Sequence, residues 1–557
     1  MCSEPRALSR ASCVQNGDFN FDEIKRMKLT FMRTVLIGSL SISTIQAQYT
    51  PEMQGFKSIN EDIIKAQMSF LASDWMEGRA VGEKGDRMAG DYIASMLQLY
   101  GIQPFGDQIK TSGAETSVNK RSYFQNFVLL KSLPGNENAL QIRSAEGKTV
   151  RTITLTEDVD YTVWASDPSS EITAPVVFAG YGYRNDELRY NDFAKLDVKG
   201  KFILKISGYP AFASDKIRSQ DYYRLSMKTD SMYKALGIVG VIEFNINSKV
   251  VGRPQNPDFM NMSPAEGSPR SGKPRASWSI PGDKINDSPK RVFISVKAAN
   301  ELLKGTGIDI NEYISKADRN QPYALNQQVT KEIYLKTSVT TTQVPVRNVL
   351  GIIEGKKNDE FIVLGAHYDH VGFGNGYLWN GADDNASGTV GVMTIARAIM
   401  ETGQKPEKSI IIALWDAEET GLMGSRYYVD NTGFPLNQIK LNLNFDMISR
   451  YISDSEPDKV TMTYTEKYPV FRDITAANLQ KYNIRLNVDY QPSVDPPGGS
   501  DHRTFTAKGI AVMRFKPGHR EEYHQPGDEI STIDWDIMGK IIKISFLNTW
   551  QLSNSEW

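Results

Sequence analysis

Cysteine is nearly absent from this 557-residue chain, in which Cys2 and Cys13 are the only two and both lie close to the N-terminus. A mature chain without that N-terminal stretch has neither a disulfide scaffold nor a thiol nucleophile. Excess charge is absent as well, because 64 Lys and Arg residues stand against 66 Asp and Glu residues. The resulting net charge of −2 offers no attraction to nucleic acid or to an anionic membrane, so we expect neither as a partner.

Long hydrophobic runs are also lacking, with one short exception near the N-terminus. Residues 34–47 are apolar but rich in Ser and Thr, and they are too few to span about 30 Å of hydrocarbon. Basic residues precede this run and a small residue ends it, which is the pattern of a secretory signal peptide over residues 27–47. We therefore expect translation to begin at Met27, residues 1–26 to be a non-native extension, and the mature protein to be periplasmic or secreted, without a membrane anchor.

The remaining chain is too long for one compact core. Amphipathic helical spacing dominates up to about residue 130, and short β-rich runs follow it. From Asn348 onward, apolar runs of strand length alternate with helical segments. This alternation predicts an α/β fold, a three-layer sandwich with a mostly parallel central sheet. We expect residues 50–130 and 336–557 to form that sandwich, and residues 131–335 to form a β-rich insertion.

Histidine is rare, and all five histidines lie in the last two-fifths of the chain. They stand among acidic motifs: Gly-Ala-Asp-Asp-Asn-Ala-Ser-Gly begins at Gly381, Asp-Ala-Glu-Glu begins at Asp416, and Asn-Phe-Asp-Met begins at Asn444. Imidazoles and carboxylates are the ligands that zinc takes at catalytic sites. The pattern therefore predicts a hydrolytic metal site.

The positions of these residues support the same interpretation. His367 directly follows one apolar run, Glu418 and Glu419 follow another, Asp446 ends a third, and His524 lies one loop beyond the last. Open α/β sheets bind ligands outside the carboxyl ends of their strands. We therefore expect these side chains to meet at one edge of the sheet.

Together with Ser500-Asp501-His502 and Tyr523-His524, these motifs resemble the co-catalytic zinc peptidases that include aminopeptidase Y, glutamate carboxypeptidase II and the transferrin receptor. The resemblance implies a zinc-exopeptidase fold with a protease-associated domain at residues 131–335. It implies two zinc ions as cofactors and peptides as substrates, and our first hypothesis for the reaction is the removal of N-terminal residues. It makes no prediction about the oligomeric state.

Residue by residue, the resemblance implies that Asp383 bridges the two zinc ions. It implies His367 and Asp446 as the other ligands of the first ion, and Glu419 and His524 as those of the second. A cis peptide bond is expected between Asp383 and Asp384.

The resemblance assigns supporting roles to other side chains. Glu418 is the general base, and Tyr523 is a donor to the tetrahedral oxyanion. Asp369 is expected to orient the imidazole of His367, and Asp384 to support the metal ligands without binding the metal itself. His370, by contrast, is expected to be an ordinary loop histidine.

Other functions remain open at this stage. A carboxypeptidase or dipeptidase would use the same two-metal site, but no motif identifies the arginines with which glutamate carboxypeptidase II binds its acidic substrate. A single-zinc glutaminyl cyclase and a non-catalytic binding protein of the transferrin-receptor type are less favoured, because all the ligand types are present. Nitrogen and oxygen ligands do not by themselves distinguish zinc from cobalt or manganese.

Overall fold

The computed structural model describes most of the chain after residue 49, namely residues 50–109, 120–163, 169–213, 222–246, 276–283, 289–321, 323, 325, 330–374 and 376–557. The predicted extension at residues 1–26 and the predicted signal peptide at residues 27–47 lie outside the described residues. Within these ranges, none of the helices combines the length and the apolar character that crossing a membrane requires.

The main sheet has ten strands. They are β1 (Gln103–Pro104), β2 (Phe124–Pro134), β11 (Ser277–Ser279), β14 (Val339–Ile353), β15 (Lys357–His367), β18 (Lys408–Trp415), β19 (Ile439–Asn444), β20 (Lys459–Thr465), β21 (Asn487–Ser493) and β22 (Ala511–Lys516). Their order is β11-β2-β14-β18-β15-β19-β22-β20-β21, and β1 pairs with β14.

The centre of this sheet is parallel and its flanks are mixed. Strands β18, β15, β19 and β22 run parallel to one another, whereas β14 and β20 pair with them in antiparallel fashion. Every residue of β18 is buried, as expected of a strand covered on both faces. The α/β prediction is confirmed, but the sheet is mixed rather than mostly parallel. Its parallel pairs join these central strands and β20 with β21, and its other pairs are antiparallel.

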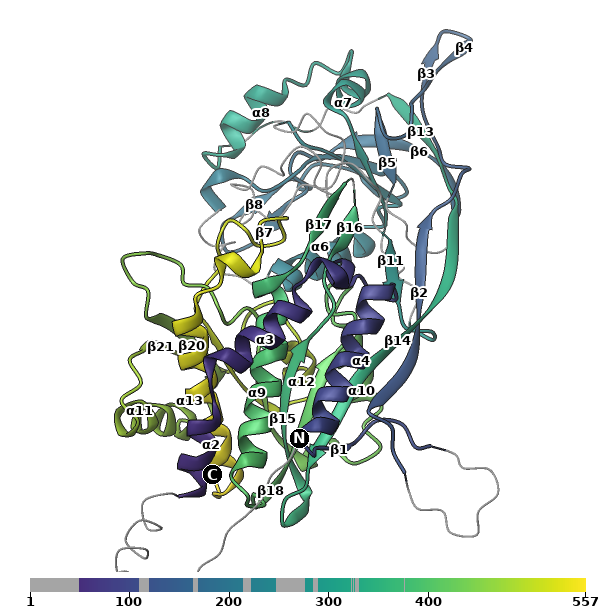
Figure 1. Cartoon of the computed structure of the whole chain (residues 1–557). Coiled ribbons are helices and arrows are strands. Elements are labelled where there is room, and N and C mark those ends of the chain that lie inside the picture. The colour runs from purple at the N-terminus through teal and green to yellow at the C-terminus, as the bar shows by residue number, and fades with distance from the viewer. Residues whose placement is uncertain are drawn as a thin grey trace, which may run out of the picture.

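Helices cover both faces of the sheet, which gives three layers (Figure 1). Ile410 and Ile412 of β18 face one core, and Ile411 and Ala413 face the other. The first face is covered by α2 (Pro51–Ser58), α3 (Glu61–Leu71), α4 (Lys84–Leu99), α9 (Gly388–Glu401), α11 (Val470–Lys481) and α13 (Trp535–Ser553). The opposite face is covered by α10 (Met423–Asp430) and α12 (His502–Thr506).

A second sheet of eight strands forms a separate core with three helices. Its strands are β3 (Ala139–Glu146), β4 (Thr149–Thr154), β5 (Tyr161–Val163), β6 (Ser170–Phe178), β9 (Phe202–Ile206), β10 (Gly240–Phe244), β12 (Lys290–Ile294) and β13 (Lys331–Thr337). Its helices are α6 (Tyr222–Ala235), α7 (Val296–Leu303) and α8 (Ile310–Ala317). Figure 1 shows this unit at the top of the view, joined to the main sheet through β2 and β14. Its identity as a protease-associated domain stays a prediction.

Short elements complete the described chain. The small strands are β7 (Arg184–Asn185), β8 (Tyr190–Asn191), β16 (Gly372–Gly374) and β17 (Tyr377–Trp379). The short helical turns are η1 (Asp74–Arg79), η2 (Ala211–Ala213), η4 (Ala382–Ser387), η5 (Leu436–Gln438) and η6 (Ile530–Thr532). Two of these turns, η1 and η4, contribute to the site, together with the loop after β15.

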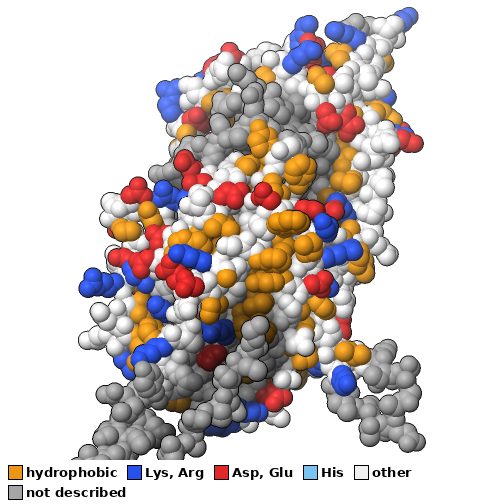
Figure 2. All heavy atoms as spheres, in the orientation of Figure 1, with side chains coloured by type: hydrophobic (Ala, Val, Ile, Leu, Met, Phe, Trp, Pro, Cys, Tyr) orange, Lys and Arg blue, Asp and Glu red, His pale blue; other side chains and the backbone are white. Residues whose placement is uncertain are grey.

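The face shown in Figure 2 carries acidic and basic side chains side by side, with no patch of one sign over the described residues. Apolar side chains gather over α3 and α4 on this face. The large exposed apolar residues of this N-terminal segment include Phe70 at 40%, Trp75 at 78% and Leu99 at 74% exposure. The mixed charge of this face agrees with the small net charge of the chain.

We expect substitutions in the buried central strands to lower the stability of the main sheet most. Ile412 has no exposed surface, so the change Ile412→Ala is expected to lower the free energy of unfolding by about 2–5 kcal/mol through a cavity. Urea unfolding followed by tryptophan fluorescence measures the change. The matched control is Ile452→Ala, because Ile452 is 62% exposed. Equal unfolding midpoints for the two variants would contradict the assignment of β18 to the core.

Candidate active site

The predicted site residues stand where parallel strands end. His367 is the last residue of β15, the two adjacent glutamates lie in the turn after β18, Asp446 follows β19, and His524 lies in the loop after β22. Asp384 comes from η4, the turn that leads into α9. Because these strand ends share one edge of the sheet, residues far apart in the sequence meet there.

Three side chains form what we call the first donor group: His367, Asp384 and Asp446. Nε2 of His367 lies 3.4 Å from Oδ1 of Asp384 and 3.8 Å from Oδ1 of Asp446. Oε2 of Glu418 lies 3.9 Å from the same imidazole nitrogen, so the predicted base stands beside this group.

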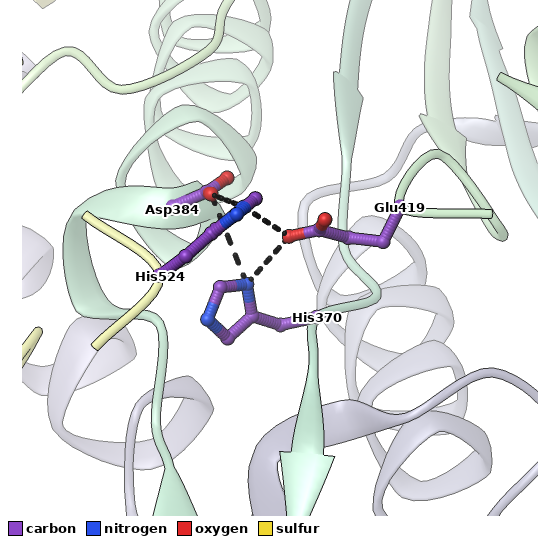
Figure 3. A group of neighbouring side chains, drawn as sticks. All are labelled: His370, Asp384, Glu419 and His524. Carbon is purple, nitrogen blue, oxygen red and sulfur yellow. Dashed lines mark ion pairs between the residues drawn. The ribbon is translucent and has the colours of Figure 1, made fainter. Parts of the chain in front are cut away.

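Four side chains form the second donor group: His370, Asp384, Glu419 and His524 (Figure 3). Nε2 of His524 lies 2.8 Å from Oδ2 of Asp384 and 2.9 Å from Oε1 of Glu419. Nδ1 of His370 lies 2.9 Å from that same glutamate oxygen. His370 thus belongs to the site, whereas the sequence suggested an ordinary loop histidine.

Asp384 is the residue that the two groups share, with one carboxylate oxygen toward each. The sequence assigned that shared position to Asp383, and the structure corrects the assignment by one residue. Neighbouring residues of a turn point in different directions, so only one of two adjacent aspartates can occupy the position. The cis peptide bond is also one residue later than expected, between Asp384 and Asn385.

Asp383 instead has a fixed supporting position. Its Oδ1 accepts hydrogen bonds from the N–H and the hydroxyl of Ser449, at 3.0 and 2.7 Å. Asp528, a residue that sequence reasoning missed, accepts from the N–H groups of Asp383 and Asp384 at 2.9 and 3.0 Å. Both carboxylates therefore hold the turn that presents the shared aspartate. Nothing in the residue types around Asp528 indicates this role, because its partners are main-chain groups.

Asp369 holds the other side of the site. Its two carboxylate oxygens accept hydrogen bonds from the N–H groups of Glu418 and Glu419, at 3.0 and 3.1 Å. Nδ1 of His367 lies 3.2 Å from the main-chain oxygen of Asp369 and 3.7 Å from its Oδ1. The expected contact with the imidazole is thus shared between main chain and side chain, and the carboxylate also fixes the turn that carries both glutamates.

Arg79 in η1 joins these loops from the N-terminal segment. Its guanidinium is buried and donates four hydrogen bonds of 2.6–2.9 Å to the main-chain oxygens of Leu71, Tyr368, Asn380 and Gly381. The Arg79 oxygen in turn accepts from the N–H of His370 at 3.0 Å. One side chain therefore ties the loop after β15 to the turn that precedes Asp384.

The remaining predicted residues surround the groups. The ring of Tyr523 stacks on His524 with centroids 3.9 Å apart, and the ring of His519 meets Tyr523 edge-on at 4.8 Å. His502 is buried, and its Nε2 lies 3.1 Å from the main-chain oxygen of Pro497. The Tyr523 hydroxyl as an oxyanion donor stays a prediction.

Burial and crowding perturb the acids of the site. Burial raises the pKa of Glu418 well above its usual range, and the nearby Asp501 adds to this rise while His367 opposes it. Burial likewise raises the pKa of Asp501 to about 7. Burial also works against ionisation of Asp384, yet His367 and His524 hold the pKa of Asp384 well below its ordinary value. Buried carboxylates outnumber the imidazoles at this edge, and an excess of buried negative charge is the charge balance of a cation site.

The donor set fits a zinc ion. It consists of imidazole nitrogens and carboxylate oxygens, the ligands typical of catalytic zinc. Within the described part of the chain, Nδ1 and Nε2 of His370 and Oε1 of Glu419 are buried without a hydrogen-bond partner. Buried polar atoms are normally satisfied, so these atoms indicate that the arrangement is built around a further group.

Comparison with known proteins agrees with this chemistry. Residues 348–547 match the model of Peptidase family M28, which confirms the predicted resemblance for that segment. Leucine aminopeptidase 2 of Trichophyton rubrum is 42% identical over 209 residues, 34% of this chain and 41% of the relative. Aminopeptidase YwaD of Bacillus subtilis is 33% identical over 220 residues, 38% of this chain and 45% of the relative. The alignments thus span less than half the length of these relatives.

Solved structures extend the likeness to nearly the whole chain. An aminopeptidase from Aneurinibacillus sp. strain AM-1 superimposes with a TM-score of 0.54 at 19% identity, covering 91% of this chain and 97% of that one. BSAP, a zinc aminopeptidase from Bacillus subtilis, superimposes with a TM-score of 0.50 at 20% identity, covering 88% of this chain and 95% of that one. At these identities the likeness establishes the fold.

The two N–H groups bound by Asp528 predict the effect of replacing it. Asp528→Asn leaves one acceptor oxygen and turns an amide donor toward the other N–H. A buried N–H without an acceptor is expected to lower the free energy of unfolding by about 1–3 kcal/mol. Chemical unfolding in excess chelator measures this without any contribution from metal. The control is Asp359→Asn, because Asp359 is exposed and its replacement is expected to leave the free energy of unfolding unchanged. An equal decrease in both variants would show that the hydrogen bonds to Asp528 do not stabilise the fold.

Proposed function

We propose that this chain, whose residues 348–547 belong to Peptidase family M28, is a zinc-dependent aminopeptidase that removes residues from the free N-terminus of peptides. The observation that carries the proposal is the position of Asp384, whose two oxygens face two separate groups of buried donors. The names of the similar leucine aminopeptidase 2 and aminopeptidase YwaD support the choice of substrate end.

Two zinc ions would be held with Asp384 as the common ligand. His367 and Asp446 would complete the first site, and Glu419 and His524 the core of the second. When bound, the two ions would supply Lewis acidity, which polarises a scissile carbonyl and makes water a nucleophile at neutral pH.

Glu418 is the proton carrier in this proposal. Its side chain is 11% exposed and stands beside the first donor group, where the hydrogen bond from its N–H to Asp369 fixes its direction. It takes one proton from the attacking water and delivers that proton to the leaving amine. Tyr523, adjacent to His524, is proposed to donate its phenolic hydrogen to the tetrahedral oxyanion.

A second candidate, a carboxypeptidase or dipeptidase, is favoured by two cationic side chains at the same edge. Arg514 pairs with Asn444 in the sheet, two residues before Asp446, and is 8% exposed. Nη1 of Arg514 lies 3.3 Å from Nδ1 of His502, and Nζ of Lys516 lies 3.6 Å from the sulfur of Met447. Both cations help to lower the pKa of Asp446, but no ion pair of the described residues includes either of them. In this second candidate they would receive the substrate carboxylate.

The wider context of the reaction is also part of the proposal. The pattern of residues 27–47 supports export to the periplasm or the medium, where peptides are the substrates. The unit formed by the second sheet is proposed to be a protease-associated domain that restricts access to the site. Its position supports the restricted access, because Figure 1 shows that unit beyond β16 and β17, the hairpin that follows β15.

The base assignment predicts the effect of Glu418→Gln. The amide keeps the shape of the side chain but does not accept the proton, so kcat is expected to fall by about 10²–10⁴-fold. Steady-state hydrolysis of a peptide, together with zinc content by mass spectrometry, measures this. Glu354→Gln, 64% exposed, is the control. A Glu418→Gln variant of full activity and normal zinc content would exclude Glu418 as the base.

The two candidate functions make opposite predictions for one peptide with a free and with an acetylated N-terminus. An aminopeptidase shortens only the free form, stepwise from its N-terminus, and excess chelator stops the reaction. A carboxypeptidase shortens both forms from the other end, and Arg514→Gln then raises KM. Mass spectrometry of the products decides between them. If zinc-loaded protein cleaves neither peptide, the aminopeptidase proposal is wrong, and hydrolysis of a dipeptide then separates a dipeptidase from a binding protein.

A further inference from the structure

The two donor groups of the site are unequal. The first offers three side chains and the second offers four. The additional member is His370, from the loop after β15, whose side chain is fully buried. The resemblance discussed above assigns this residue no role.

The geometry of His370 is that of a donor to the second group. Its Nδ1 lies 2.9 Å from Oε1 of Glu419 and 3.9 Å from Oδ2 of Asp384. Nε2 of His524 lies at 2.9 and 2.8 Å from the same two oxygens. Figure 3 shows the four side chains converging from different directions, so one ion between them is within reach of all four.

A hydrogen bond does not account for the shorter of the two His370 contacts. Nδ1 of His370 and Oε1 of Glu419 are 2.9 Å apart, yet neither atom has a partner in hydrogen-bond geometry among the described residues. A neutral imidazole nitrogen and a carboxylate oxygen can both act as electron-pair donors. Two such atoms placed side by side and buried are unfavourable alone and are satisfied together by a cation.

The ring is also held in this position by its surroundings. A Cβ atom on Gly381 would lie 2.4 Å from Cδ2 of His370, so the ring packs against a place where only glycine leaves room. Arg79 fixes the same two segments, because its oxygen accepts from the His370 N–H and its guanidinium donates to the Gly381 oxygen. The imidazole therefore has one orientation, with Nδ1 toward Glu419.

We propose that His370 binds, through Nδ1, the same zinc ion as Glu419, His524 and Asp384. This rests on the proposed two-metal site and goes beyond it by making the two positions chemically different. Four protein donors complete a tetrahedral ligand set, as in zinc sites that retain their metal, whereas three leave a coordination position open. The second donor group is therefore the tighter zinc site, and the first, beside Glu418, is the one with the open position.

The test is zinc binding by the full mature protein, measured by competition with a chromophoric chelator. His370→Ala removes the donor, and His370→Asn keeps a polar group near Nδ1 that hydrogen-bonds but is a poor zinc ligand. Wild type is expected to bind two equivalents with different affinities. Both variants are expected to lower the zinc affinity of the tighter step by more than about 100-fold and to leave that of the weaker step unchanged. Removing a residue that only hydrogen-bonds to a metal ligand typically lowers the affinity by about 10–100-fold.

His502→Asn is the matched control, because His502 is equally buried at the same edge but belongs to neither donor group. Thermal unfolding of the metal-free variants checks that each is folded. A His370→Asn variant that retains the tight step, as the control is expected to do, would overturn the proposal and reduce His370 to a packing or hydrogen-bonding role. A wild-type protein that binds no zinc would instead refute the underlying two-metal function.

Cobalt(II) gives an independent readout of the ligand set. The first equivalent bound by wild type is expected to show the intense visible bands of a four-coordinate ion, and these bands are expected to be lost in His370→Asn. Weak bands of higher coordination in wild type, or unchanged bands in the variant, would equally overturn the proposal.

Discussion

Mutual repulsion among buried carboxylates is the constraint on which the rest of the site depends. Asp384, Glu418, Glu419 and Asp446 meet at one edge of the sheet with side chains 4–12% exposed, where charges repel more strongly than in water. Such a cluster persists only if the main chain that carries it is held rigidly. The structure meets this requirement by using other charged groups to bind main-chain atoms: Asp369 receives the N–H groups of the two glutamates, and Asp528 receives those of the aspartate turn.

Arg79 completes this support from the opposite direction in the sequence. It lies in a short turn before α4, yet its guanidinium satisfies carbonyls on both sides of the second donor group. Burial lowers the pKa of Arg79 to about 10, against the raising effect of Asp528 and other nearby carboxylates, so it stays charged at neutral pH. A cation that donates to carbonyls compensates in part for the negative charge without occupying a metal position. The N-terminal segment is thus part of the same site as the loop after β15 and the turn that presents Asp384.

The sequence predicted the sheet and most of the site because both depend on recognisable residue types. Fully apolar runs indicate central parallel strands. His367, Glu419 and Asp446 stand at or just after the ends of such runs, and His524 lies one loop beyond the last of them. It failed where residue type carries no information. Two adjacent aspartates look alike, so the choice of Asp383 over Asp384 was wrong by one residue. Arg79 and Asp528 were not found because they bind main-chain atoms, which any sequence provides. His370 was set aside because an imidazole in a loop is ordinary until its neighbours are known.

The two donor groups differ, so the two sides of the site are not equivalent. Glu418 lies 3.9 Å from His367 in the first donor group, whereas His370 lies beside Glu419 in the second. Adjacent glutamates therefore stand beside different groups, and the extra nitrogen donor is on the side away from Glu418, the proposed base. A fully occupied ligand set has no room for a small reacting molecule, while an incomplete one keeps a position free. If His370 binds zinc as proposed, the open coordination position is on the side on which Glu418 stands, and the other side mainly holds Asp384 in place.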